Sequence, residues 1–308
     1  VDKRRATHIQ VRGNFLERGQ PVEPSIPKFF GSLPEDAPAN RLGVAKWLTN
    51  ADNPLTARVQ VNRVWARLFG QGIVLTEEDF GTQGIVPTHP ELLDWLAVEF
   101  VNQGWSMKKL LRLIVMSSTY QQASHFSDGS QADPDNRWLA RGPRFRLEAE
   151  IVRDQALAAG GILSDKMHGP SVMPPQPPGI WKVTYSTLKW KTSQGEDQPD
   201  RSLYTYWRRT SPYPSMLTFD AGTRETCVLR RVRTNTPLQA LTTLNDPVYI
   251  QAAAGLAARM AKQEANDAQR ASFGFRLAVV RPPDDLERQR LVQVFEEARD
   301  HYRQNKEE

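Results

Sequence analysis

The sequence predicts a mainly α-helical protein (α+β at most) in which a helical body carries a short N-terminal β segment and a loop-rich insertion. Helix caps followed by apolar residues at helical spacing recur from about residue 40 to the C-terminus. Alternation typical of a strand is clearest at the N-terminus, over residues 7–15. Prolines and aromatic residues gather between 163 and 219, which indicates an irregular insertion.

The N-terminal segment, residues 1–40, is predicted to hold a strand or hairpin arm and then an extended stretch. Residues 7–15 alternate and end on turn residues, and prolines follow at positions 21, 24 and 27. The first residues are typical of the middle of a chain, so we expect a piece of a longer protein. Because an isolated strand needs partners, we also expect the upstream part of that protein to supply some of them.

Capping signals place the helices of the body. Asn53-Pro54 combines an N-cap with proline at the first helical position, and Gly70 ends that helix. Residues 88–91 have capping-box spacing, and Ser106 opens a further helix. Another helix spans residues 147–159, before two glycines.

Helices resume after the insertion. Thr236-Pro237-Leu238-Gln239 combines a capping box with proline, and we expect Leu238 and Leu241 to be buried. Asp246-Pro247 opens the next helix, and the tail from 284 to 302 is strongly amphipathic. We therefore expect a helical domain over 41–262, with the insertion at 163–219, and an amphipathic helical tail over 263–308.

Composition excludes several classes of protein. The chain has 308 residues, of which 39% are hydrophobic and 24% are charged, as in ordinary globular proteins. Its densest apolar run, residues 110–116, is short and contains Arg112, so no membrane span is expected. The single cysteine, Cys227, excludes an internal disulfide, and the five histidines lack ligand spacing. We expect no metal site.

The excess positive charge is confined to one segment. Residues 201–233 hold seven arginines, no lysine and two acids, which gives 7 − 2 = +5, the net charge of the whole chain. Arginine grips carboxylates with a planar fork, so these side chains could pair internally or hold an anionic polymer, a haem propionate or an acidic partner. We expect at least one of Arg230, Arg231 and Arg233 to be buried and paired, and Arg208 and Arg209 to be more exposed. The binding candidates are Arg201, Arg208, Arg209, Arg230, Arg231 and Arg233.

Acidic and aromatic side chains give the remaining candidates. Glu148, Glu150 and Asp154 lie on one predicted helix and form the best acidic set for acid–base catalysis. The alternative is that these acids pair with the arginines of 201–233. Exposed aromatic faces of the insertion could stack on sugars, bases or a protein, or they could build a local core. The aromatic candidates are Trp181, Trp190, Tyr206 and Trp207.

Several segments together resemble one family. The motifs include Asn-Arg-Val-Trp at 62–65, Asp-Phe-Gly at 79–81, Arg-Leu-Glu-Ala-Glu at 146–150 and Thr-Pro-Leu-Gln-Ala-Leu at 236–241. In this order they resemble the planctomycete C-terminal domain of unknown function found in large exported proteins that also carry a cytochrome-c-like domain. The resemblance runs from about residue 7 to about residue 262.

The resemblance implies export to the periplasm or the extracellular space, a multidomain parent, and haem only in a separate domain of that parent. It implies no catalytic residues, and no haem attachment motif occurs here. We therefore expect an interaction or structural domain that docks a cytochrome-c-like domain or binds an extracellular polymer. The alternative is a polysaccharide hydrolase whose acids face the aromatic insertion. Nucleic acid is not an expected partner, because no recognition motif accompanies the charge.

Overall fold

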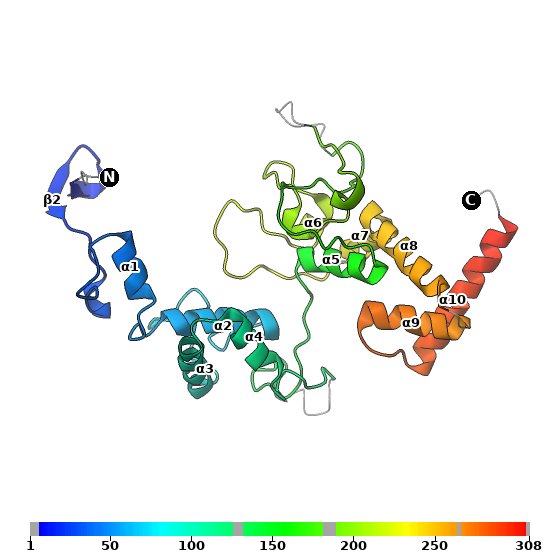
Figure 1. Ribbon diagram of the computed structural model, residues 1–308, viewed down its shortest axis with the longest axis horizontal. Helices are drawn as coiled ribbons and strands as arrows, with labels where there is room; N and C mark the ends of the chain where they lie inside the picture. Colours follow the sequence, from blue (N-terminus) through cyan, green and yellow to red (C-terminus); the bar gives the residue numbers. More distant parts are fainter. Residues whose placement is uncertain (1–5, 126–131, 181–188, 264–265, 306–308) are drawn as a thin grey trace. The chain divides into compact units, whose positions relative to one another are not determined.

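The computed structural model describes residues 6–125, 132–180, 189–263 and 266–305. It forms two compact units, Val1–Phe145 and Arg146–Glu308, which are described separately. The prediction of a mainly α protein is confirmed, because the described residues form ten α-helices and one two-stranded sheet (Figure 1). The division between the units falls inside the stretch 41–262, and the boundaries expected at 40 and 262 stay predictions.

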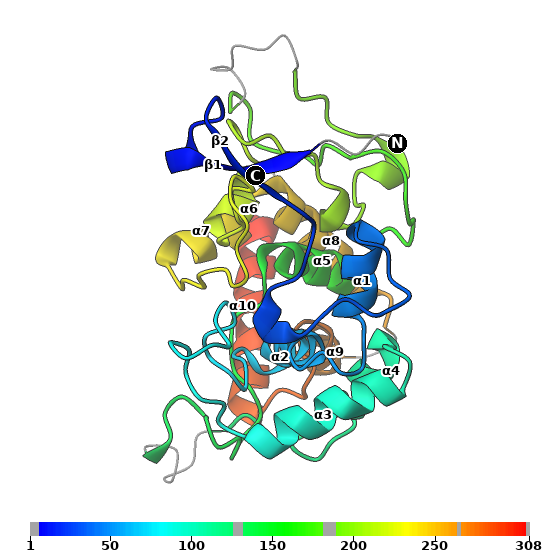
Figure 2. The same ribbon diagram turned by 90° about the vertical axis from the view of Figure 1, so that its left-hand side faces the viewer.

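The sheet of the first unit is a hairpin near the N-terminus. Strand β1 (Thr7–Gln10) pairs antiparallel with β2 (Arg18–Val22), and the two strands lie side by side (Figure 2). Thr7 is opposite Val22, and the register shifts between His8 and Gln10. A partner of the predicted strand is therefore supplied by this chain itself, within the following extended segment.

Four helices follow in the first unit. Asn53 Oδ1 accepts hydrogen bonds from the backbone N–H groups of Leu55 and Thr56 at 3.0 and 3.1 Å, so it caps the second helix, whose regular part begins slightly later than expected. Gly70 ends that helix with a φ of +86°. The four helices are α1 (Arg41–Leu48), α2 (Thr56–Phe69), α3 (Pro90–Asn102) and α4 (Met107–Val115).

The core of the first unit lies between α2, α3 and α4. Trp65 stacks on Phe69 with ring centroids 4.1 Å apart. Asn62 is fully buried among apolar residues, and its side-chain amide bonds both the N–H and the C=O of Val74 at 2.9 and 3.0 Å. This pair of bonds fixes the chain that follows α2. Other core residues are Val61, Ile73, Leu93, Leu96, Phe100, Leu110 and Ile114.

The second unit is built around a close contact between two helices. A Cβ atom at Gly160 of α5 would lie 2.6 Å from the Ala252 carbonyl oxygen of α8, so only glycine permits this approach. Leu157, Tyr213 and Val248 are almost fully buried at this contact. The helices of this unit are α5 (Ala149–Gly160), α6 (Pro214–Thr218), α7 (Pro237–Asn245), α8 (Pro247–Ala261), α9 (Asp267–Val279) and α10 (Asp285–Gln304).

The insertion at 163–219 is irregular, as predicted. Its described residues contain two short 3-10 turns, Gly195–Asp197 and Ser202–Tyr204, and the short helix α6. A single parallel bridge joins Val172 to Thr205. The insertion packs on α5 and α8 through Tyr213, which has no exposed surface.

Helix α7 begins as predicted, with Thr236 as its N-cap and Pro237 in its first turn. The expected burial of Leu238 and Leu241 is wrong, because they are 60% and 55% exposed. Gln239 is the buried residue. Its amide nitrogen donates to the Thr218 carbonyl oxygen and to Thr234 Oγ1, both at 3.0 Å, so the polar side of α7 faces the unit. The prediction of a helix is confirmed, whereas the prediction of which side of the helix faces the core is wrong.

Candidate functional site

The two acidic candidates at the start of α5 form ion pairs with one arginine. Arg231 donates from Nη1 and Nη2 to the two carboxylate oxygens of Glu150 at 2.7 and 3.1 Å, and Nη1 lies 3.7 Å from Glu148 Oε2. The three side chains are only 18–25% exposed.

Burial is the largest single influence and raises the pKa of Glu150. The hydrogen bonds and charge of Arg231, a backbone hydrogen bond and the charge of Arg224 together outweigh it and lower the pKa below its ordinary value. The expected internal pairing thus holds for Arg231, but the expected burial is wrong, because Arg231 and Arg233 are half-buried and Arg230 is exposed.

Replacing Arg231 with alanine should lower the free energy of unfolding by about 1.5–3 kcal/mol at neutral pH, because two charged hydrogen bonds are lost. Because the pKa of Glu150 is lowered in the fold, this contribution is complete above pH 4.5 and disappears as the pH falls through the folded value. The matched control is exposed Arg230→Ala, which should change stability by less than about 0.5 kcal/mol. Urea denaturation at several pH values checks both. Equal losses would contradict the pairing.

A second arginine, Arg146, connects the two ends of the loop formed by residues 221–233. Arg146 forms an ion pair with Asp220, and its Nε donates to the Thr234 carbonyl oxygen at 2.9 Å. Asp220 also accepts from the Thr234 backbone N–H at 2.8 Å. Both ends of the loop 221–233 are therefore tied to Arg146, which lies shortly before α5.

The third acidic candidate, Asp154, is also engaged. Its Oδ1 accepts from the Ser202 backbone N–H at 2.8 Å and lies 3.7 Å from Arg153 Nη1. Arg153 is 1% exposed, and it donates to the Asp200 carbonyl oxygen at 2.8 Å and to Ser202 Oγ at 3.2 Å. These contacts attach the insertion to α5. Each of the three acids predicted for catalysis thus has a partner inside the second unit.

The other arginines of the segment divide between half-buried and exposed positions. Arg209 and Arg230 are exposed, whereas Arg201 and Arg233 are half-buried. Arg208 is also half-buried and donates to Thr210 Oγ1 at 3.1 Å, so its predicted exposure is wrong. A turn closed by the Ser211 N–H and the Arg208 carbonyl oxygen contains Thr210, the residue that the side chain contacts.

The aromatic candidates contribute mainly to a local core. Trp190 donates from Nε1 to the Pro174 carbonyl oxygen at 3.0 Å and stacks on buried Tyr213 at 5.9 Å. Trp207 donates to the Thr223 carbonyl oxygen, and the Arg224 guanidinium lies 4.8 Å from its ring centroid. Tyr206 is half-buried. Trp181 lies outside the described residues. Among the four, the described ones hold the insertion together.

A buried ionisable group beside this core escaped the sequence analysis. Asp246 is 7% exposed and caps α8 by accepting from the Val248 N–H at 3.0 Å. Burial raises the pKa of Asp246, although the Val248 hydrogen bond and the charge of Arg153 oppose the shift. Burial likewise raises the pKa of Tyr213 and Tyr249 beyond their ordinary range. The Asp-Pro cap was visible in the sequence, but its burial was not.

Replacing Asp246 with asparagine should stabilise the protein at neutral pH. A raised folded pKa means that ionisation disfavours the folded state, so stability is lost as the pH rises through 3.8 toward the folded value. Asparagine keeps the helix cap without the charge. Thermal denaturation should therefore show Asp246→Asn above wild type at pH 7, with the two melting temperatures converging below about pH 3. A variant that is less stable at pH 7 would contradict the argument.

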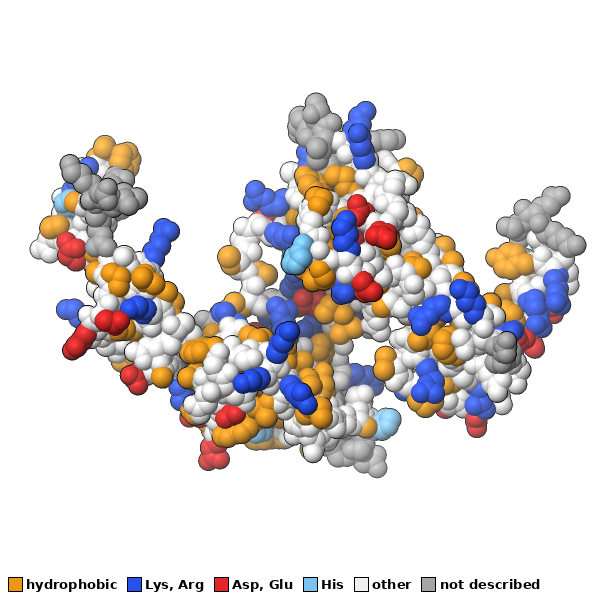
Figure 3. All heavy atoms as spheres, in the orientation of Figure 1, with side chains coloured by type: hydrophobic (Ala, Val, Ile, Leu, Met, Phe, Trp, Pro, Cys, Tyr) orange, Lys and Arg blue, Asp and Glu red, His pale blue; other side chains and the backbone are white. Residues whose placement is uncertain are grey.

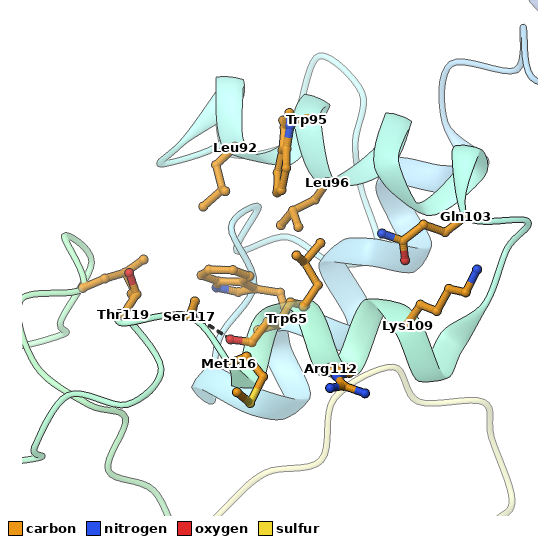
Figure 4. A pocket seen from close by; sticks show the side chains of 13 residues that line it. Trp65, Leu92, Trp95, Leu96, Gln103, Lys109, Arg112, Met116, Ser117 and Thr119 are labelled. Atoms are coloured by element: carbon orange, nitrogen blue, oxygen red, sulfur yellow. Dashed lines mark hydrogen bonds between the residues drawn. The ribbon is translucent and has the colours of Figure 1, made fainter.

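The first unit contains a groove between α3 and α4 with a volume of about 830 Å³. Figure 4 shows Leu92, Trp95 and Leu96 of α3 facing Trp65 of α2, with Lys109 of α4 at one end. Figure 3 shows that exposed hydrophobic side chains also occur at other places on the surfaces of the two units. The full lining is Trp65, Leu92, Trp95, Leu96, Gln103, Lys109, Arg112, Leu113, Ile114, Met116, Ser117, Thr119 and Leu139.

The groove is apolar but not neutral. Its lining includes two cations and no acid. Trp95 is 53% exposed and Met116 is 65% exposed, so large apolar surface faces solvent. Neither residue was predicted to belong to a site. The available signal was α4 itself, which carries three basic residues and no acidic one.

The described residues thus define a mainly helical protein in which no group of three or more His, Cys, Asp and Glu is placed to hold a metal. No described helix is long and apolar enough to cross a membrane. The model of the family described as a protein of unknown function (PSD1, DUF1553) matches residues 40–295. The chain belongs to this family. No curated protein and no solved structure gives a significant match.

Proposed function

We propose that the chain is a non-catalytic interaction domain of a larger exported protein. The observation that carries the proposal is the state of the acids, because Glu150 and Asp154 are held by Arg231 and by the Ser202 N–H. A glycosidase needs two carboxyl groups that flank a cleft and act on the substrate. Carboxylates held in this way are poor candidates for that chemistry, which disfavours the polysaccharide hydrolase.

The partner that we propose is another domain of the same exported protein, located in the periplasm or outside the cell. The family resemblance supports a cytochrome-c-like domain as this partner, with its haem bound entirely in that domain. The groove between α3 and α4 supports a protein ligand, because its walls are largely apolar. An extracellular polymer is less well supported, since the described aromatic residues of the insertion are used internally.

The test measures binding and hydrolysis with the same 308-residue chain. The chain is immobilised and exposed to the parent's cytochrome-c-like domain and, separately, to dextran sulfate, at about 50 and 200 mM salt. We expect saturable binding of the domain, and no release of reducing ends from a panel of polysaccharides. Hydrolysis that is abolished by Glu150→Gln in a folded variant would establish the enzyme instead.

A further inference from the structure

The groove between α3 and α4 presents polar groups that lack partners. Within the described part of the chain, neither Lys109 nor Arg112 has an acidic partner, and both are exposed on α4. At the same end of the groove, Gln103 donates from Nε2 to Glu99 Oε1, and this contact fixes the orientation of its amide. The Gln103 Oε1 atom is buried and accepts no hydrogen bond from the described residues. This end therefore offers positive charge, whereas the buried Oε1 atom is not accessible to a docking partner.

The lining narrows the chemistry of the occupant. Leu92, Leu96, Leu113 and Ile114 are aliphatic, and they bury the apolar side chains of a protein better than the polar faces of a sugar. Met116 adds an adaptable side chain at the rim. A groove between two helices with this composition suits an amphipathic helix that inserts its apolar face.

The polar end of the groove indicates which terminus of the partner helix would bind there. The first turn of a helix has free N–H groups, and acidic residues are favoured there by the helix dipole. Carboxylates in that first turn match the exposed cations Lys109 and Arg112. The last turn of a helix favours basic residues, which would meet Lys109 and Arg112 with like charge.

We propose that this groove docks an amphipathic helix of a partner protein, with the acidic N-terminal turn of that helix against Lys109 and Arg112. The inference rests on the proposed function of the chain as an interaction domain, and it names the surface and the partner's chemistry. From Lys109 to Met116 the helix α4 rises by about 10 Å, so the groove holds about two turns of the partner. Its apolar anchors would be spaced by three or four residues.

The test uses two stapled helical peptides of about 14 residues with identical apolar anchors. One carries two glutamates in its first turn, and the other carries them in its last turn. Fluorescence anisotropy with the full chain should show about tenfold tighter binding of the first peptide, which corresponds to one or two charged contacts. Stapling keeps both peptides helical, so the comparison reports the position of the charge.

Matched variants separate the groove from general charge attraction. Lys109→Glu should weaken binding of the first peptide about tenfold, whereas Lys108→Glu, with the same change of charge on the same helix but outside the groove, should change it less than about twofold. Trp95→Ala should also weaken binding, while exposed Val98→Ala on α3 should not. Equal affinity for the two peptides, or equal effects of Lys108→Glu and Lys109→Glu, would overturn the proposal.

The same variants distinguish this proposal from the proposed function. If the chain binds the cytochrome-c-like domain and Lys109→Glu leaves that binding unchanged, the groove is not its docking surface, and the interaction domain stands. If the chain binds neither that domain nor the peptides and hydrolyses a polysaccharide, the proposed function itself is wrong.

Discussion

Arg153→Met is expected to destabilise the second unit by about 3–5 kcal/mol, because the change strands the groups that a buried arginine satisfies. Arg153 is 1% exposed and bonds the carbonyl oxygens of Gln198 and Asp200 and the hydroxyl of Ser202. Methionine fills similar space but donates no hydrogen bond. The carbonyl groups would remain buried without donors, and Asp154 would lose its nearest positive charge.

Denaturant unfolding measures this loss, and hydrogen exchange locates it. Exchange of the Ser202 N–H, which donates to Asp154, should accelerate as the insertion loosens from α5. The control is Arg209→Met, an exposed arginine of the same chain, which should change stability by less than about 0.5 kcal/mol. If both variants unfold like wild type, Arg153 does not attach the insertion.

Asn62→Asp is expected to lower the stability of the first unit by about 3 kcal/mol or more, although the two side chains have nearly the same shape. The amide of Asn62 donates to the Val74 carbonyl oxygen and accepts from the Val74 N–H. An ionised aspartate keeps the second bond and turns the first into a repulsion between two oxygens. Because Asn62 has no exposed surface, water cannot relieve it.

The cost should decrease at low pH, where a protonated carboxyl group can donate to Val74 again. The control is Asn102→Asp at the exposed end of α3, for which we expect a change within about 0.5 kcal/mol. Circular dichroism during thermal denaturation at pH 7 and at acidic pH checks both. A loss that is the same at every pH would show that repulsion at Val74 is not the cause.

Local signals predicted the helices well because they act over three or four residues. The caps at Ser106 and Asp246 and the terminating glycines at 70 and 161 lie at helix ends in the structure. The same signals failed for α7, where Leu238 and Leu241 suggested the inward face. Helical spacing shows that a side is apolar, but a helix buries whichever side its neighbours cover.

The pairing of arginines with carboxylates shows the same limit of prediction from sequence. The concentration of seven arginines between 201 and 233 predicted carboxylate pairing, and the sequence named Glu148 and Glu150 as possible acceptors. It could not choose Arg231 among the seven, because that choice depends on a contact between residues 81 positions apart. The groove was not predicted, since it needs α2, α3 and α4 side by side.

By itself, the sequence determined the helical class, the positions of most helix ends, the irregular insertion and the resemblance to the family. All of these depend on local hydrogen bonding, on periodicity or on motifs in order. Only the tertiary structure decided that the acids of α5 are neutralised and that Lys109 and Arg112 border an apolar groove without an acid. The physical reason is that pairing and burial depend on distances in space, and only packing brings distant residues together.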